Sequence, residues 1–118
     1  MTAWVVDWLR AFTVTVAVEV AVALPLLRRI EPRRGRRIAV VLLANLATHP
    51  LVWFLFPGLN LRFETRMALS ELWAVAVEAG TYRIVWPALG PRSSGLISLL
   101  ANGASLGVGL VLRAIHLL

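Results

Sequence analysis

The chain has 118 residues, of which 59% are hydrophobic and 15% are charged, and its mean hydropathy is +0.80. Soluble domains are typically ~45–50% apolar, so this composition argues against an ordinary soluble fold and favours one membrane domain over residues 1–118. The chain has no cysteine, which excludes disulfides, thiolate metal sites and cysteine nucleophiles.

The net charge is +6, and all 12 basic residues are arginines. Six of these arginines lie in the segment 28–37, between two long apolar stretches. We therefore interpret this segment as a membrane-topology signal and not as a nucleic-acid interface. The same segment, Arg28–Arg37, is predicted to contact anionic lipid headgroups.

Four apolar stretches, each near the ~20 residues that cross a bilayer, predict an all-α integral membrane bundle of four transmembrane helices. In chain order the predicted spans are 5–27, 38–56, 67–89 and 96–118. The segments between them contain arginine, proline, glycine and serine, as turns and loops do. The first stretch carries Asp7 and Glu19 and precedes arginines, which indicates a retained helix and not a signal peptide.

The arginine-rich loop 28–37 is expected on the cytoplasmic side of a bacterial inner membrane, because positively charged loops are retained there. Both chain termini and the loop between the second and third spans would then lie outside. Four tryptophans fall near predicted span ends, where they would act as interface anchors. These are Trp4, Trp8, Trp53 and Trp86.

Three glutamates lie within the predicted spans: Glu19, Glu71 and Glu78. A charged side chain near the bilayer centre costs roughly 2.5–3.5 kcal/mol on insertion scales. Each glutamate must therefore be paired, protonated, hydrated or close to an interface. No arginine is obviously placed to neutralise Glu19 or Glu78, whereas Glu71 lies nearer the outer edge as a mouth or interfacial residue.

A rise of ~1.5 Å per residue places polar groups from all four helices in one layer, about 14–22 Å below the outer surface. The layer comprises Glu19, Asn45, Thr48, His49, Glu78, Tyr82, Asn102 and Ser105. Hydrogen bonding between helices is the competing structural interpretation for its amide and hydroxyl residues. His49 precedes Pro50, which frees a backbone carbonyl, and such broken helices often line polar cavities.

The fourth span carries two rows of small residues at a spacing of four, which allows helices to approach closely. One row is Ala101, Ser105 and Gly109, and the other is Gly103 and Gly107. We expect two contact sides, one within the bundle and one between copies in a homo-oligomer, with either row a candidate for the second.

Three motifs resemble those of small uncharacterised bacterial four-span membrane proteins, and they cover the last three spans. They are Asn45-x-x-Thr48-His49-Pro50, Glu71-x6-Glu78-Ala79-x-x-Tyr82 and Asn102-x-x-Ser105-x3-Gly109. The resemblance implies no particular activity. Small multidrug transporters also have a glutamate in their first span, but His49 and Glu78 have no expected counterpart in them. Prenyl-protein-type intramembrane proteases use a Glu-Glu pair followed by Arg, which this chain lacks.

Transport or conduction of a small cation, proton or polar solute is the first functional hypothesis. Its predicted site comprises Glu19, Asn45, His49, Glu71, Glu78, Tyr82, Asn102 and Ser105. One alternative is a structural or partner subunit whose buried acids pair with another protein's arginines. The other is an intramembrane enzyme in which Glu78 and His49 act as acid and base, or hold a divalent metal. No other cofactor is predicted.

Overall fold

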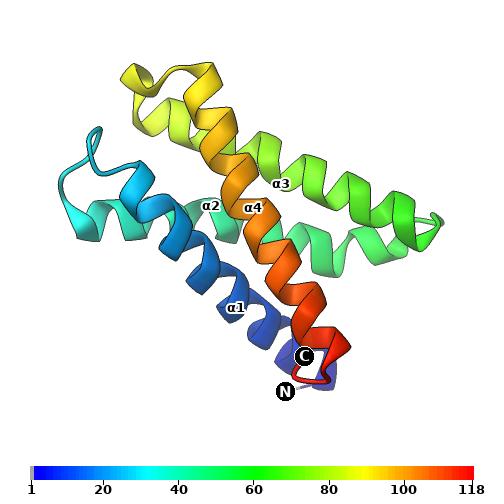
Figure 1. Ribbon diagram of the computed structural model, residues 1–118. Helices are drawn as coiled ribbons and strands as arrows, with labels where there is room; N and C mark the ends of the chain where they lie inside the picture. The colour runs from blue at the N-terminus through cyan, green and yellow to red at the C-terminus, as the bar shows by residue number, and fades with distance from the viewer. Residues whose placement is uncertain (1) are drawn as a thin grey trace.

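Four long helices form an antiparallel bundle in the computed structural model, which describes residues 2–118 and leaves Met1 of the predicted domain outside (Figure 1). The helices are α1 (Ala3–Leu26), α2 (Arg34–Phe54), α3 (Phe63–Val85) and α4 (Pro91–Ala114). Two short 3₁₀ turns, η1 (Phe56–Gly58) and η2 (Pro87–Leu89), follow α2 and α3. No strand occurs in residues 2–118, so the all-α prediction is confirmed.

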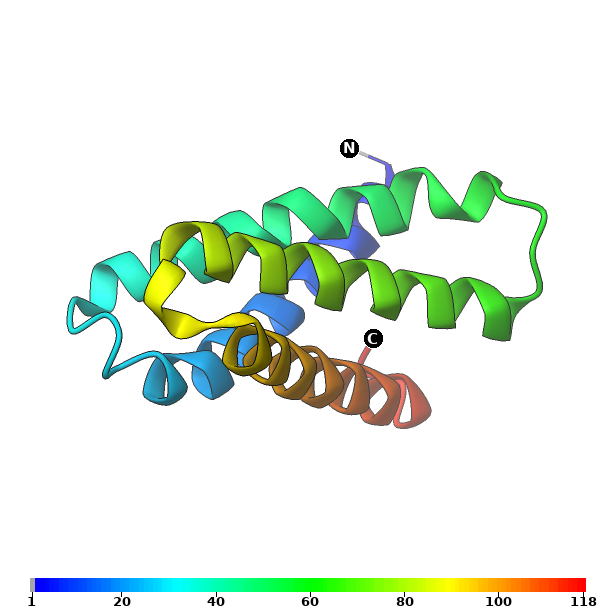
Figure 2. The same ribbon diagram turned by 90° about the horizontal axis from the view of Figure 1, so that it is seen from above.

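Each helix packs against two others, so the four helices enclose a common centre. α1 contacts α2 and α4, and α3 contacts the same two helices. The α1–α2 and α3–α4 connections lie at one end of the bundle (Figures 1 and 2). The α2–α3 connection and the chain termini lie toward the other end, which is the arrangement expected of an up-down-up-down bundle.

The helix ends follow local chemistry and shift the predicted boundaries by a few residues. α3 ends at Val85 because Pro87 disfavours helical backbone at the residue before it, and Trp86 takes φ −125° and ψ 79°. The chain then turns at Gly90, whose φ of 77° suits glycine, and α4 begins with Pro91 at its first position. α2 begins at Arg34, so the arginine-rich connection is shorter than the predicted loop.

The bundle is apolar outside and partly polar inside. Large aliphatic side chains face outward, including Ile84, which is 82% exposed, and Leu72, which is 66% exposed. Glu19 and Glu78 are both fully buried at the centre. A soluble bundle shows the opposite distribution, with apolar side chains inside.

Within residues 2–118, three segments are long and apolar enough to cross a membrane: α1, α2 extended through Gly58, and α4. The longest dimension of the molecule is 39 Å, which exceeds the ~30 Å hydrocarbon core of a typical bilayer. α3 has a similar length of 23 residues but carries Glu71, Glu78 and Arg83 within its apolar part.

Glu31 organises the arginine-rich end of the bundle. Its carboxylate pairs with Arg36 at 2.7 Å and Arg33 at 3.1 Å, and it accepts a 3.5 Å hydrogen bond from Trp86 Nε1. Trp86 is only 6% exposed, so its predicted role as a lipid-interface anchor is wrong. Arg37 is also buried, and its Nη1 donates to the Leu24 carbonyl at 2.5 Å. This contact satisfies a carbonyl of the last turn of α1, which has no partner within the helix.

Candidate functional site

Glu19 lies at the centre of the bundle and receives hydrogen bonds from two neighbouring helices. Asn45 on α2 donates its Nδ2 to Glu19 Oε2 at 2.7 Å. Ser105 on α4 donates its hydroxyl to Glu19 Oε1 at 3.1 Å. The prediction that Asn45 and Ser105 share a layer with Glu19 is therefore matched by direct contacts, because all three side chains point into the bundle.

Glu78 approaches the same region from α3, because its partner Asn102 lies one turn before Ser105, the partner of Glu19, on α4. Asn102 on α4 donates its Nδ2 to Glu78 Oε2. Glu78 Oε1 is buried and receives no donor from residues 2–118, and the Tyr82 hydroxyl one turn deeper has no partner there either. The centre of the site thus holds two carboxyl groups and one unused carboxyl oxygen.

The orientation of each asparagine amide is fixed by a second hydrogen bond. Asn45 Nδ2 also donates to the Val41 carbonyl at 3.0 Å, and Asn102 Nδ2 donates to the Ser98 carbonyl at 2.9 Å. A carbonyl and a carboxylate are both acceptors, so only the NH₂ end of an amide can contact both. Each asparagine therefore presents N–H groups, and not its oxygen, to the acid beside it.

Arginine does not neutralise either buried acid in the described part of the chain. The ion pairs found there join Glu31 to Arg33 and Arg36, and Glu64 to Arg62, all near the bundle ends. Amide and hydroxyl donors hold Glu19 and Glu78 in place of cations. Such donors satisfy carboxylate oxygens but contribute no full positive charge.

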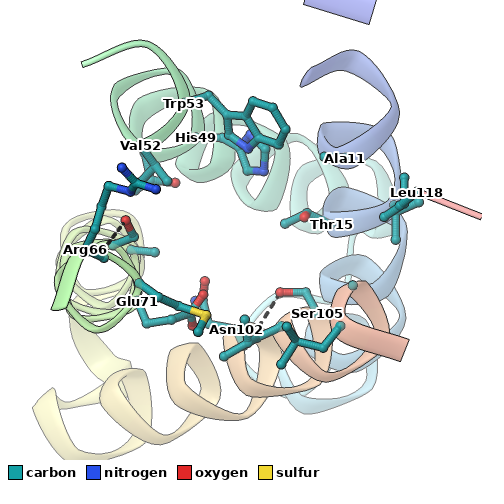
Figure 3. A pocket seen from close by; sticks show the side chains of 18 of the residues that line it. Ala11, Thr15, His49, Val52, Trp53, Arg66, Glu71, Asn102, Ser105 and Leu118 are labelled. Atoms are coloured by element: carbon teal, nitrogen blue, oxygen red, sulfur yellow. Dashed lines mark hydrogen bonds between the residues drawn. The ribbon is translucent and has the colours of Figure 1, made fainter. Parts of the chain in front are cut away.

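A cavity of about 300 Å³ leads from one end of the bundle to the acid pair (Figure 3). Its lining begins near Trp4, Arg66 and Arg113 and reaches Asn45, Asn102 and Ser105, which are the hydrogen-bond partners of the two acids. Figure 3 shows Glu71, Asn102 and Ser105 on one side of the hollow and His49 and Trp53 on the opposite side.

An apolar cluster closes the bundle on the far side of the acid pair. It comprises Ala23, Leu27, Val40, Val41, Ala44, Tyr82, Trp86 and Ile97. The cluster lies between the acids and the arginine-rich end. The cavity therefore approaches the buried acids from one end of the molecule, and apolar side chains lie between the acids and the other end.

His49 lines the cavity but does not join the acid pair. Its Nδ1 accepts a 3.0 Å hydrogen bond from Trp8 Nε1, and its ring stacks on Trp53 with centroids 6.2 Å apart. Because Nδ1 is an acceptor, the neutral ring carries its proton on Nε2. His49 thus lines the same cavity as Asn45, Asn102 and Ser105, while its hydrogen bond joins α2 to α1 and not to an acid.

Glu71 lies in the cavity wall, and Thr48 forms a hydrogen bond within its own helix. Glu71 is half-buried in the cavity wall on α3, two turns nearer the mouth than Glu78, as its shallower predicted depth implies. The Thr48 hydroxyl donates to the Ala44 carbonyl of its own helix at 3.2 Å, so it does not form the hydrogen bond between helices that is the structural alternative.

An internal repeat, which span boundaries alone do not reveal, relates the Glu–Asn pairs of the two hairpins. Residues 42–48 read Leu-Leu-Ala-Asn-Leu-Ala-Thr, and residues 99–105 read Leu-Leu-Ala-Asn-Gly-Ala-Ser. Ala-Val-Glu likewise occurs at 17–19 and 76–78. Each hairpin, α1–α2 and α3–α4, thus carries a glutamate on its first helix and the asparagine that binds it on its second. Comparing the two halves of the sequence would have revealed this pairing.

Comparison with protein-family models, curated proteins and solved structures finds no match to this chain. Residues 2–118 bring together no group of three or more His, Cys, Asp or Glu side chains that could hold a metal. The chemistry of the site is thus that of two adjacent carboxyl groups with neutral donors beside a cavity. Such a pair can exchange protons or attract small cations.

Proposed function

We propose that the protein is an integral membrane protein in which all four helices, α3 included, cross the bilayer. The outward-facing aliphatic side chains and the buried Glu19 and Glu78 support this placement. In α3 the charged side chains Glu71 and Glu78 turn toward the cavity and the bundle centre, so lipid would not contact them. Burial within a bundle is the usual position for ionisable residues in membrane helices.

We further propose that it transports or conducts a proton, small cation or small polar solute through the central cavity. The observation that carries this proposal is the pair of fully buried carboxyl groups held by neutral donors, three of which line the inner part of the cavity: Asn45, Asn102 and Ser105. Repeated hairpins around a central polar site are a common plan among membrane transporters. The apolar cluster beyond the acids would act as a closed gate, which must open for passage to the other side.

Two observations, the burial of the acids and the hydrogen bonds of His49 and Glu78, favour transport over the alternative functions. Glu19 and Glu78 are enclosed by their own chain, so an arginine of a partner subunit could not reach them without opening the bundle. His49 is bonded to Trp8, and Glu78 to Asn102, which leaves the proposed acid–base pair of an enzyme unassembled.

Flux measurements on purified protein in liposomes test the proposal. An enclosed pH-sensitive dye would report proton movement, and tracer ions would report sodium and potassium. The E19Q/E78Q double variant is expected to lose flux, because both central carboxyl groups are removed with little change of shape. E64Q, which removes an exposed acid at the start of α3, serves as the control and should keep flux. Unchanged flux in a folded double variant across these ions and a panel of small polar solutes would refute transport.

A further inference from the structure

We infer that Glu19 and Glu78 hold one proton between them and that the proton is the ion that this site binds. The inference rests on the proposed transport function and names its coupling ion. Binding adds one proton to two carboxylates, and the charge of the pair changes from −2 to −1. The proton is placed on Glu78 Oε1, from which the new O–H donates to a carboxylate oxygen of Glu19.

The hydrogen-bond pattern leaves one carboxyl oxygen, Glu78 Oε1, free to carry this proton. Three of the four carboxyl oxygens already accept a donor from Asn45, Ser105 or Asn102. Glu78 Oε1 is buried without a donor from residues 2–118, and the Glu19 carboxyl group is held beside Glu78 by Ser105, one turn after Asn102 on α4. Two ionised carboxylates in such contact repel strongly, and one shared proton removes that repulsion and satisfies the fourth oxygen.

The donors around the pair disfavour a metal cation. A metal ion needs oxygen acceptors, such as an amide oxygen or a backbone carbonyl, to complete its coordination. Asn45 and Asn102 instead present N–H groups whose orientation is fixed by the Val41 and Ser98 carbonyls. These hydrogens would point at a bound cation and repel it, whereas they stabilise a carboxylate that shares a proton.

The other helices supply no compensating cation at this depth. On α2 the nearest titratable group is His49, which accepts from Trp8. On α3, Glu71 lies two turns toward the cavity mouth and Tyr82 lies one turn deeper. On α4 no charged residue occurs between Arg92 and Arg113, and Arg113 lies at the mouth. α1 contributes only Glu19 near the centre, its other charged residues being Asp7 and Arg10 near the chain start.

Infrared spectroscopy of the protein in lipid nanodiscs tests the shared proton directly. All measurements use the E71Q background, so that Glu71 contributes no carboxyl signal. At neutral pH the E71Q protein is expected to show a protonated-carboxyl band that shifts to lower frequency in D₂O. Adding E19Q or E78Q should abolish the band, because the new amide replaces the shared proton as donor and leaves the other acid ionised.

Three results would overturn the inference. They are absence of the band in the E71Q protein, persistence of the band in both single variants, and its displacement by sodium, potassium or magnesium. The first and third results need no substitution in the pair, so they decide the matter even if the variants fail to fold. If the spectra are as expected but no flux is measured, the shared proton is supported and transport is refuted. If flux is observed but a metal ion displaces the carboxyl band, the shared proton is refuted and transport is not.

Discussion

At the scale of single residues, Asn45 and Asn102 each donate to one buried acid, but only Glu19 has a second donor on another helix. Asn45 shares Glu19 with Ser105, so loss of Asn45 leaves one donor in place. Asn102 is the protein donor to Glu78 within residues 2–118, apart from the neighbouring acid. Loss of Asn102 should therefore destabilise the protein more than loss of Asn45.

Asn102→Leu is expected to lower the free energy of unfolding by about 1–3 kcal/mol, because it leaves a buried carboxyl group without its donor. Asn45→Leu should cost less, since Ser105 still donates to Glu19. Unfolding in detergent, followed by circular dichroism, measures both. Asn60→Leu in the exposed α2–α3 connection is the control and should change stability by under about 0.5 kcal/mol. A larger loss for Asn45→Leu would contradict the assigned contacts.

The contacts of Glu31 with Arg33 and Arg36 predict that the protein loses stability in acid at the arginine-rich end. The hydrogen bond from Arg33 lowers the pKa of Glu31 from 4.5 to about 2. Because the folded pKa is the lower one, its contribution to stability is present above pH 4.5 and is lost as pH falls toward 2. E31Q should therefore be less stable than the natural protein at neutral pH, and the difference should vanish in acid. E64Q removes an acid whose ion pair with Arg62 is exposed and 3.9 Å long, so it serves as the control and should change stability at neutral pH by under about 0.5 kcal/mol.

At the scale of secondary-structure elements, α4 uses its two small-residue rows differently. Ala101 and Ser105 are buried within the bundle, whereas Gly103 and Gly107 are exposed. A Cβ atom added at either exposed glycine would meet no described atom within 4 Å. The outward row is thus the one that remains available for contact between copies, as the proposed homo-oligomer requires.

The G103I/G107I double variant should keep the fold of one chain and lose self-association, because two branched side chains prevent close helix approach. Crosslinking in liposomes and light scattering in detergent would measure the change. Gly80 on α3 is also exposed with open space around it, so G80I is the matched control and should leave association unchanged. Association that survives the double variant would place the oligomer contact elsewhere.

The helices, and the common level of Glu19, Asn45 and Ser105 along the bundle, could be predicted from sequence, because long apolar runs and helical rise determine them. Rise gives depth along a helix but not which neighbour a side chain contacts. For this reason Asn45 and Glu19 could be placed at one level, while the bond of His49 to Trp8 could not be foreseen. The burial of Glu31 and Trp86 depends on how two connections meet, which local sequence does not specify.

At the scale of the whole molecule, the cavity and the closed apolar cluster define two different ends. If the arginine-rich end faces the cytoplasm, as positively charged loops do, the cavity opens to the outside. Orientation therefore decides from which side a proton first reaches the acid pair.

Single-cysteine labelling tests this orientation cleanly, because the chain has no native cysteine. Asn60→Cys lies in the α2–α3 connection, and Ser93→Cys lies near the start of α4 at the opposite end. In intact cells a membrane-impermeant thiol reagent should label Asn60→Cys and not Ser93→Cys. Permeabilised cells, in which both sites should react, provide the control. The reverse pattern would invert the proposed topology.

The repeated hairpin has an evolutionary consequence. Counted from the two glutamates, Phe12 corresponds to Glu71, and counted from the two asparagines, His49 corresponds to Leu106. Two separate copies of one hairpin would have to carry the same side chain at each such position. Two halves within one chain can differ there, so His49, with Phe12 packed on it, lies opposite Glu71 across the cavity. Selection could thus alter the cavity lining while the two buried acids and their asparagines stayed the same.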